Sequence, residues 1–153
     1  MSSFTPADPS YAARVRRSFE RQGLMAHLGA ELLRVEPGLV EIALPWRREL
    51  TQQHGYFHAG ATTAVADSAG GYAAYSLFPV DSSVLTVEFK INLLAPAEGE
   101  RLRATGRVVK PGRTLTVCEL EVLAERDGGA KPCAWGIQTV FCLLDRPDEA
   151  ARD

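Results

Sequence analysis

Asp67 is the only formal charge, histidines aside, in the 31 residues from Leu50 to Val80, although 24% of the whole chain is charged. Its neighbours are mainly Ala, Gly, Thr, Val and Tyr, a composition suited to burial. A carboxylate is costly to bury without a partner, and acids placed in this way often act as a general base or a nucleophile. Asp67 is therefore a candidate catalytic residue. The alternative is a buried structural acid that caps a loop or pairs with an arginine.

A second chemical feature precedes Asp67, in the segment "HAG". A helix that begins near His58 would point its first free N–H groups, those of Ala59 and Gly60, at whatever lies in front of it. That end of a helix carries about half a positive charge. It is suited to a carbonyl oxygen that becomes an oxyanion during acyl transfer. The segment therefore indicates acyl-transfer chemistry, with Asp67 as the missing base or nucleophile.

The spacing of these two features limits how they can cooperate. Nine residues at about 1.5 Å rise place Asp67 about 13 Å along the helix from His58 and roughly on its opposite face. Asp67 therefore cannot reach a carbonyl held at the N-terminus of its own helix. A second copy related by a two-fold axis could supply it, so a catalytic Asp67 predicts a homo-oligomer, at least a dimer, with two shared sites.

A metal site is the other reading of the histidines. His54 and His58 are four residues apart, as metal ligands on a helix can be. However, Gly55 interrupts a helix at this point, no glutamate follows as in zinc proteases, and Asp67 lies too far away. We therefore predict no metal.

The elements that would position these residues follow from hydrophobic periodicity. A modest helix is expected from Tyr11 to about Leu28. Its apolar stripe consists of Ala12, Val15, Phe19 and Leu24. The segment "AELLRVEPGLVEIALP" predicts two short strands that turn at Pro37-Gly38, and residues 46–57 read as a loop.

The stretch from Ala59 to Leu77 lacks proline and has small residues on every side, which predicts a long buried helix. Its three glycines each lower helix propensity by about 1 kcal/mol, which makes sense if the helix must lie close against something. Residues 84–96 then alternate with a period of two. Leu85, Val87, Phe89, Ile91 and Leu93 form the apolar side of this half-buried strand.

Three more strands are expected within residues 101–110, 113–125 and 133–144, joined by turns at Pro111-Gly112 and Asp127-Gly128-Gly129. The fold class is therefore α+β. One long central helix would be wrapped by a curved antiparallel sheet of about six strands, with a short N-terminal helix. This is the hot-dog arrangement.

Composition fits one domain of 153 residues. We expect flexible residues 1–10, a single domain over 11–145 and a flexible tail over 146–153. A net charge of −2 and a pI near 5.9 argue against nucleic acid and anionic membranes as partners. The N-terminus lacks a signal-like apolar core, so a cytoplasmic protein is expected. Cys118, Cys133 and Cys142 are widely spaced and odd in number, as is typical of buried thiols in a reducing compartment.

The segments "QQHGYFHAG" and "ATTAVAD" resemble the hot-dog acyl-CoA thioesterases of the phenylacetate-pathway (PaaI-like) type. Their signature is an Asn, two residues, Gly, two residues, then His-Gly-Gly, with an acid nine positions after the His. Here the pattern falls on Gln52, Gly55, His58, Ala59, Gly60 and Asp67. Gln52 replaces the usual Asn and Ala59 the first Gly of the pair. The resemblance extends through "VLTVEFKINLLAPA" and "KPGRTL".

This resemblance implies hydrolysis of an acyl-CoA thioester to a free acid and coenzyme A, with no cofactor beyond the coenzyme A of the substrate. Asp67 from the partner chain would act as nucleophile or as general base, while Gln52 and Thr86 lie near the catalytic water. His58 would either polarise the carbonyl or only orient the loop and the helix start. Arg113, and less so Lys110, would contact the coenzyme A phosphates.

Two rival functions remain open from the sequence. A hot-dog hydratase or dehydratase would act on the same thioesters, usually with a His and an acid. A non-catalytic acyl-CoA-binding protein would bind the thioester in the same tunnel but with an impaired site. This possibility stays open because Gln52 replaces the usual Asn. Four aromatic residues are expected in the core or an interface rather than against substrate: Phe57, Tyr72, Tyr75 and Trp135. The acyl preference and the choice between dimer and tetramer stay open.

Overall fold

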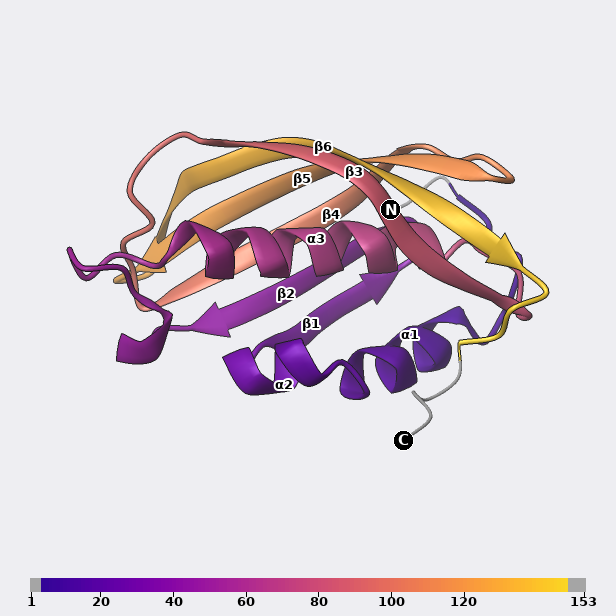
Figure 1. The fold of residues 1–153 in the computed structure, drawn as a ribbon, viewed down its shortest axis with the longest axis horizontal. Helices are drawn as coiled ribbons and strands as arrows, with labels where there is room; N and C mark the ends of the chain where they lie inside the picture. The colour runs from indigo at the N-terminus through magenta and orange to yellow at the C-terminus, as the bar shows by residue number, and fades with distance from the viewer. Residues whose placement is uncertain (1–3, 149–153) are drawn as a thin grey trace.

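The computed structural model describes residues 4–148. Its elements are α1 (Tyr11–Glu20), α2 (Gly23–Leu28), β1 (Glu31–Glu36), β2 (Leu39–Pro45), the 3-10 turn η1 (Arg48–Leu50), α3 (Ala59–Tyr75), β3 (Ser82–Leu93), β4 (Arg101–Lys110), β5 (Leu115–Arg126) and β6 (Gly129–Leu144). One antiparallel sheet, in the order β1-β2-β4-β5-β6-β3, curves around α3 (Figure 1). The predicted six-stranded sheet wrapped around one long helix is confirmed.

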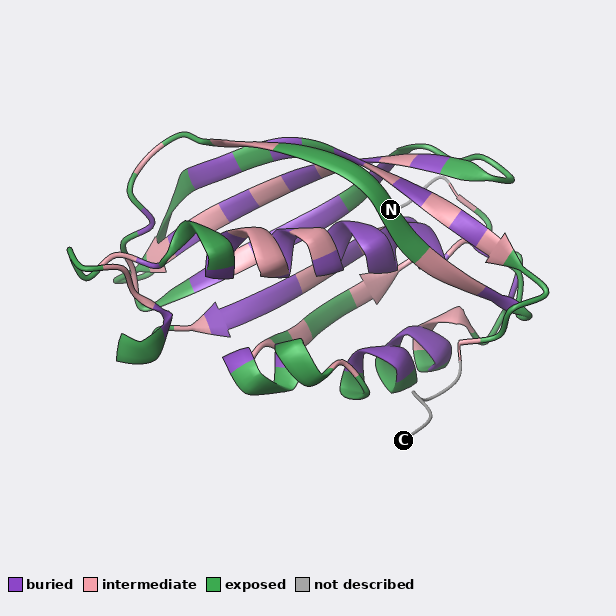
Figure 2. Ribbon diagram, viewed as in Figure 1, coloured by how far each residue is buried: buried purple, intermediate pink, exposed green. Residues whose placement is uncertain are grey.

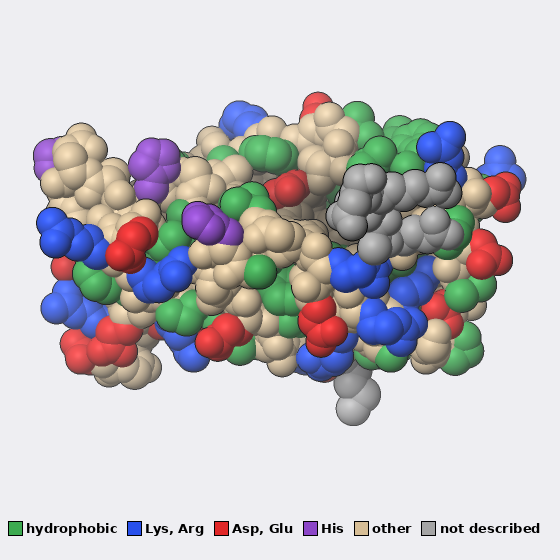
Figure 3. Space-filling model, turned by 60° about the horizontal axis from the view of Figure 1, so that its bottom comes forward, with side chains coloured by type: hydrophobic (Ala, Val, Ile, Leu, Met, Phe, Trp, Pro, Cys, Tyr) green, Lys and Arg blue, Asp and Glu red, His purple; other side chains and the backbone are tan. Residues whose placement is uncertain are grey.

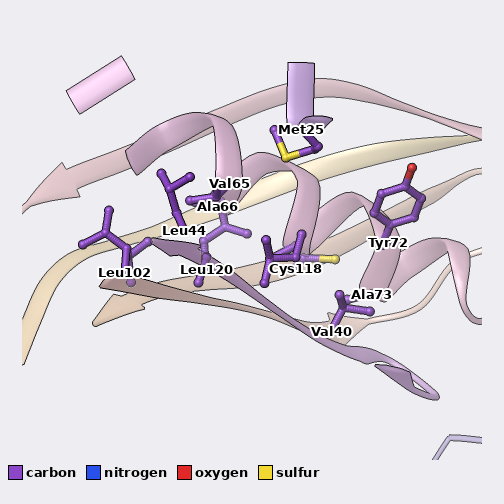
Figure 4. Close-up of a cluster of buried hydrophobic side chains, with 14 of the residues drawn as sticks. Met25, Val40, Leu44, Val65, Ala66, Tyr72, Ala73, Leu102, Cys118 and Leu120 are labelled. Carbon is purple, nitrogen blue, oxygen red and sulfur yellow. The ribbon is translucent and has the colours of Figure 1, made fainter. Parts of the chain in front are cut away.

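Close packing explains the small residues of α3. Gly106 in β4 passes directly beneath the helix, where a Cβ would overlap the backbone of Ala69 and Gly70. Figure 4 shows a cluster of buried apolar side chains from α3 and the sheet. They include Val65, Ala66 and Ala73 of α3, Val40 and Leu44 of β2, Leu102 of β4 and Leu120 of β5. Larger residues on α3 would hold the sheet away from the helix.

The N-terminal helix prediction was wrong in one respect, because two short helices replace one. Gln22 has an extended backbone, with φ −73° and ψ 105°, which ends α1 and begins α2. The turn between them changes the buried face. Leu24, assigned to the apolar stripe, is 56% exposed, whereas Met25 and Leu28 are buried.

Arg14 fastens α1 to the end of α3. Its guanidinium is buried and donates to main-chain carbonyls at and just beyond the C-terminus of α3, at 3.2 Å from Tyr75 O and 2.6 Å from Phe78 O. Its Nε lies 3.2 Å from the Asp8 carboxylate, which is also buried. The pKa of Asp8 is lowered, chiefly by the hydrogen bond that its carboxylate accepts from the Ser10 hydroxyl. The carboxylate therefore stays charged beside Arg14. These contacts hold α1 across one end of α3.

A β-bulge divides β3 into two halves. Thr86 lies opposite Val140 of β6, and the register shifts before Glu88. Residues opposite each other in an antiparallel pair share a face. Val84 and Thr86 therefore face α3 before the bulge, and Phe89 after it, because Phe89 lies opposite the inward-facing Gln138. The predicted single alternation is thus wrong before the bulge, where Thr86 rather than Leu85 turns inward.

β3 is also an edge strand, which overturns its prediction as half-buried. In the sheet order it pairs only with β6, and most of its residues are exposed (Figure 2). Even on the inner face Phe89 is 44% exposed. Leu85 and Val87 are exposed as well. The strand therefore presents apolar surface that a single chain leaves uncovered.

The surface has no field of a single charge on the face drawn in Figure 3, where acidic and basic side chains are interspersed. Ion pairs account for part of this pattern, such as Arg103 with Glu125 at 2.6 Å. Among residues 4–148, no helix is both long and apolar enough to cross a membrane.

Candidate active site

Asp67 lies at the middle of α3 and borders a cavity of about 460 Å³ between α3, β3 and the junction of α1 with α2. Its carboxylate is half-buried. Leu24, Ala64 and Val84 supply apolar walls, whereas Gln22, Ser68 and Tyr72 supply polar ones. The cavity therefore offers both kinds of contact beside a carboxylate.

The carboxylate is held through one oxygen only. Thr86 Oγ1 donates to Asp67 Oδ1 at 2.7 Å, and Gln138 Nε2 donates to the same oxygen at 2.6 Å. Oδ2 has no hydrogen-bond partner within residues 4–148. One oxygen is thus fixed, while the other keeps its lone pairs for a proton or an electrophile. The sequence-based alternative of an arginine partner for Asp67 is not what the structure shows.

Gln138 is the residue of this site that sequence reasoning missed. It lies on the helix-facing side of β6, is fully buried, and also donates to Thr86 Oγ1 at 3.0 Å and to Asp67 O at 3.1 Å. A usable signal existed in the sequence. The other helix-facing positions of this part of β6 are small or apolar: Ala134, Gly136, Val140 and Cys142. One amide among them indicates a specific polar partner.

The polar wall of the cavity is a hydrogen-bonded cluster. Gln22 Nε2 donates to Tyr72 Oη at 3.0 Å, and Ser68 Oγ donates to Gln22 Oε1 at 3.2 Å. Ser18 Oγ lies 3.1 Å from Tyr72 Oη. Burial raises the pKa of Tyr72 more than these hydrogen bonds lower it, so the phenol is neutral. Tyr72 thus belongs to the core, as expected, but it also borders the cavity.

At the N-terminus of α3, His58 is the N-cap residue. Its Nδ1 accepts from the Gly60 N–H at 2.8 Å. The Gly60 N–H is therefore already engaged, whereas the Ala59 N–H has no partner in the described part of the chain. Because Nδ1 accepts, Nε2 of a neutral His58 ring carries the proton and can donate. The free donors at this helix end thus include Ala59 N–H and His58 Nε2–H.

Gln52 lies in the loop before α3 and turns its side chain back on that loop. Its Oε1 accepts from the His54 N–H, and its own N–H donates to Tyr56 O at 2.9 Å. Gln52 and Ala59 line a second cavity, of about 520 Å³, together with Leu93. The amide nitrogen of Gln52 is the part left to meet a ligand there.

One chain does not bring the two groups of predicted residues together. None of the cavities found in residues 4–148 is lined both by Asp67 and by any of Gln52, His58, Ala59 or Gly60. The helical rise sets Asp67 about 13 Å from His58. A site that uses both groups needs a second chain.

Arg113 and Lys110 lie at the turn from β4 to β5, and both are exposed. Arg113 borders a cavity of about 360 Å³ with Phe78 and Pro79, beyond the C-terminus of α3. This is the opposite end of the helix from His58 in the same chain. Within one chain, Arg113 and Lys110 are therefore far from the oxyanion donors at the start of α3.

Other reactive groups do not form a centre. In the described range, no three His, Cys, Asp or Glu side chains are grouped so as to hold a metal ion. Burial raises the pKa of Cys118 to about 12 and that of Cys133 to about 11. Both are therefore neutral thiols rather than nucleophiles. Trp135 is exposed on the sheet, where its Nε1 donates to Glu119 at 2.9 Å.

Comparison with known proteins now places this fold and site in a family. A family model described as "Thioesterase superfamily" matches residues 54–131, which include the start of α3, Asp67 and Thr86. The chain belongs to the thioesterase superfamily. The prediction of a thioester hydrolase is confirmed at that level.

Two relatives of this thioesterase carry names that state a reaction. The proofreading thioesterase EntH of Klebsiella pneumoniae is 27% identical, over 74% of this chain and 82% of the relative. The 1,4-dihydroxy-2-naphthoyl-CoA hydrolase of Listeria monocytogenes is also 27% identical, over 69% of this chain and 85% of the relative. Both alignments span most of the relative.

Solved structures agree with the fold of this thioesterase. A thioesterase family protein from Silicibacter pomeroyi is 52% identical and has a TM-score of 0.86, covering 88% of this chain and 98% of that one. The Escherichia coli PaaI protein, from the phenylacetic acid degradation operon, has a TM-score of 0.78 at 18% identity, covering 88% and 94%. The resemblance to the PaaI-like hot-dog proteins is thereby confirmed for the fold.

Proposed function

We propose that this thioesterase hydrolyses acyl-CoA to a free acid and coenzyme A in sites shared between two chains. The observation that carries the proposal is the Asp67 carboxylate, fixed through Oδ1 with Oδ2 unpartnered beside a cavity. The relative named as a naphthoyl-CoA hydrolase supports a coenzyme A thioester as substrate. No resident cofactor is required for this reaction.

The helix end of one chain would hold the thioester carbonyl. Ala59 N–H and His58 Nε2–H are free to donate to it, and the helix dipole adds to their effect. This revises the sequence-based expectation, in which Gly60 N–H was the second donor, because His58 Nδ1 already occupies that group. Both donors would stabilise the negative charge that develops on the carbonyl oxygen.

Asp67 of the partner chain would then act on the carbonyl carbon. As a general base it takes a proton from water, whose oxygen adds to the carbon, and collapse of the adduct expels the coenzyme A thiolate. As a nucleophile it forms an acyl-aspartyl anhydride, which water then hydrolyses. A single turnover in ¹⁸O-labelled water identifies the nucleophilic route when water opens the anhydride at the Asp67 carbonyl, because label then enters Asp67; opening at the acyl carbon labels the product acid, as the general-base route does.

The acyl group would enter the cavity beside Asp67, since that cavity is the space the carboxylate borders. The exposed apolar residues of β3 support a pairing of two chains along this edge. Arg113 and Lys110 are exposed cations suited to the coenzyme A phosphates, although only an assembled dimer would bring them near the thioester.

The test is thiol release from short, medium, long and aryl acyl-CoAs by wild type and Asp67→Asn. This change removes the charge and keeps the shape. A fall in kcat/KM of about two orders of magnitude or more is expected for a catalytic acid. Asp81→Asn, at an exposed position before β3, is the matched control and should keep full activity.

Two results would contradict the proposal. Equal rates for Asp67→Asn and wild type would make the carboxylate structural. Acyl-CoA binding with no thiol release from any substrate would identify a binding protein instead. Thermal unfolding of both variants establishes that any loss of rate is not a loss of fold.

A further inference from the structure

We propose that Gln138 is a positioning residue of this site, whose buried amide sets the Asp67 carboxylate so that Oδ2 stays open to the cavity. The inference rests on the proposed function, because it assigns Asp67 a chemical role. It adds a third element, the strand β6, to the Asp67 half of the site, which the sequence placed on α3 and β3.

The hydrogen bonds form a closed triangle. Gln138 Nε2 lies 2.6 Å from Asp67 Oδ1 and 3.0 Å from Thr86 Oγ1, and Thr86 Oγ1 lies 2.7 Å from Asp67 Oδ1. Thr86 donates its one proton to the carboxylate, so the lone pairs of its oxygen can accept from Gln138. Each side chain in the triangle therefore fixes the other two. A carboxylate held by two donors on one oxygen cannot rotate without losing both.

The far side of the amide shows which way it must point. Gln138 Oε1 is buried and has no hydrogen-bond partner. Turning the amide over would place that oxygen against the carboxylate oxygen, and Nε2 would lose its acceptors. The amide therefore faces Asp67 as a donor, which suits an ionised acid. The unpartnered oxygen is the consequence of that orientation.

Gly70 makes room for this amide. A Cβ at Gly70 would overlap Gln138 Oε1 and lie 2.5 Å from Leu120 Cδ2. The glycine stands in the middle of α3, where it lowers helix propensity. Because Gly70 has no side chain, the amide of Gln138 on the facing strand has room beside α3. The neighbouring Gly71 does not share this constraint, because a Cβ there would meet nothing within 4 Å.

Gln138 does not itself meet the substrate. Its exposure is 0%, and it does not line the cavity beside Asp67. An effect on catalysis must therefore pass through Asp67 and Thr86. A residue that acts in this way changes the geometry of the reacting group, so it should change kcat and leave substrate binding almost unaltered.

The test is steady-state kinetics of Gln138→Met on the best acyl-CoA of the panel. Methionine has a similar length but cannot donate. We expect kcat to fall about 10- to 100-fold, since small misplacements of a reacting group have effects of this size, with KM within about twofold of wild type. Val122→Ala, which opens a cavity in the same sheet away from Asp67, controls for a general loss of stability and should keep its kcat.

Gly70→Ala is a second route to the same displacement if Gln138→Met folds poorly. The added methyl pushes the amide from its place, so the same fall in kcat with an unchanged KM is expected. A wild-type-like kcat in a folded Gln138→Met or Gly70→Ala, or a change confined to KM, would overturn the inference. Wild type that hydrolyses no acyl-CoA would instead overturn the proposed function, so the two failures are distinct.

Discussion

His58 combines two features that substitution can separate. Its Nδ1 caps α3 by accepting from Gly60 N–H, while its Nε2 is free to donate. The sequence left open whether this ring acts on the substrate or only orients the helix start. Asparagine at the same position can keep the capping acceptor but not the ring donor.

We expect His58→Asn to unfold at nearly the wild-type temperature and to lose about 100-fold in kcat, because one oxyanion donor is typically worth that much. His58→Ala should lose the same activity and also about 1 kcal/mol of stability through the missing cap. Thermal unfolding and thiol release measure both. Full activity in a folded His58→Asn would leave the ring with a structural role only.

Single residues differ in how far the sequence reveals them. Asp67 was predictable because an isolated carboxylate in an apolar helix is unusual in itself. Thr86 was chosen through a resemblance, and the inner face that it occupies depends on a bulge with no sequence signal of its own. Gln138 was not found, since its role arises only when β6 is brought against α3, 71 residues away in the chain.

Among the elements, α3 carries two adjacent glycines with opposite constraints. Gly70 faces the sheet, where a Cβ would meet Gln138 and Leu120, whereas Gly71 faces open space beside the cavity. Relative to alanine, each glycine lowers the helix propensity by the same small amount. Their surroundings therefore decide the effect of adding a methyl group.

Gly71→Ala should raise the free energy of unfolding by up to about 1 kcal/mol through propensity and reduced freedom of the unfolded chain. Gly70→Ala should lower it by about 1–3 kcal/mol through overpacking. Denaturant titrations of the two variants check the sign. A stabilised Gly70→Ala would mean that the amide of Gln138 moves aside without strain.

The elements themselves were mostly predictable, because each has a clear period. The long helix was assigned correctly from its small residues and lack of proline. The four strands that follow it were assigned from their alternation and from glycine and proline turns, although β6 begins at Gly129 rather than at Cys133. The break between α1 and α2 was not predicted, although Gly23, directly after Gln22, is a residue that weakens a helix. The exposure of β3 was not predicted either. Hydrophobic alternation shows that one face of a strand is apolar, but not whether that face is covered by the same chain.

At the scale of the whole molecule, the separation of Asp67 from the start of α3 makes a site of two chains testable by mixing. Ala59 is the first helical residue, and proline is accepted at that position. His58 already has a backbone, at φ −64° and ψ 139°, that can precede a proline. Ala59→Pro therefore removes one N–H while keeping the helix.

We expect Ala59→Pro and Asp67→Asn each to be nearly inactive, and an equal, re-equilibrated mixture to regain about a quarter of the wild-type activity. Half of the random dimers are then mixed, and each has one intact site of two. Thiol release after co-refolding measures this. A mixture no more active than its parts would mean that each site lies within one chain.

Whole-molecule features were the hardest to foresee. Hot-dog architecture followed from the order of the elements, but the cavity beside Asp67 did not, because its polar wall combines Gln22 of the α1–α2 junction with Ser68 and Tyr72 of α3. The polar wall depends on the α1–α2 break, which was not predicted from the sequence. If the cavity holds the acyl group as proposed, acyl preference depends in part on this junction.

The open edge of β3 has a further consequence, for the life of a newly made chain. If two chains pair along this edge as proposed, a chain not yet paired offers the unpaired backbone groups of the strand and the exposed Val87 and Phe89 to any unfolded polypeptide nearby. Glu88 and Lys90 are interleaved with them, as gatekeeper charges are along strands prone to aggregate. The yield of assembled protein in the cell would then depend on the rate of pairing with a second copy relative to the rate of mispairing. At low expression the second copy is scarce, so mispairing with other polypeptides would gain.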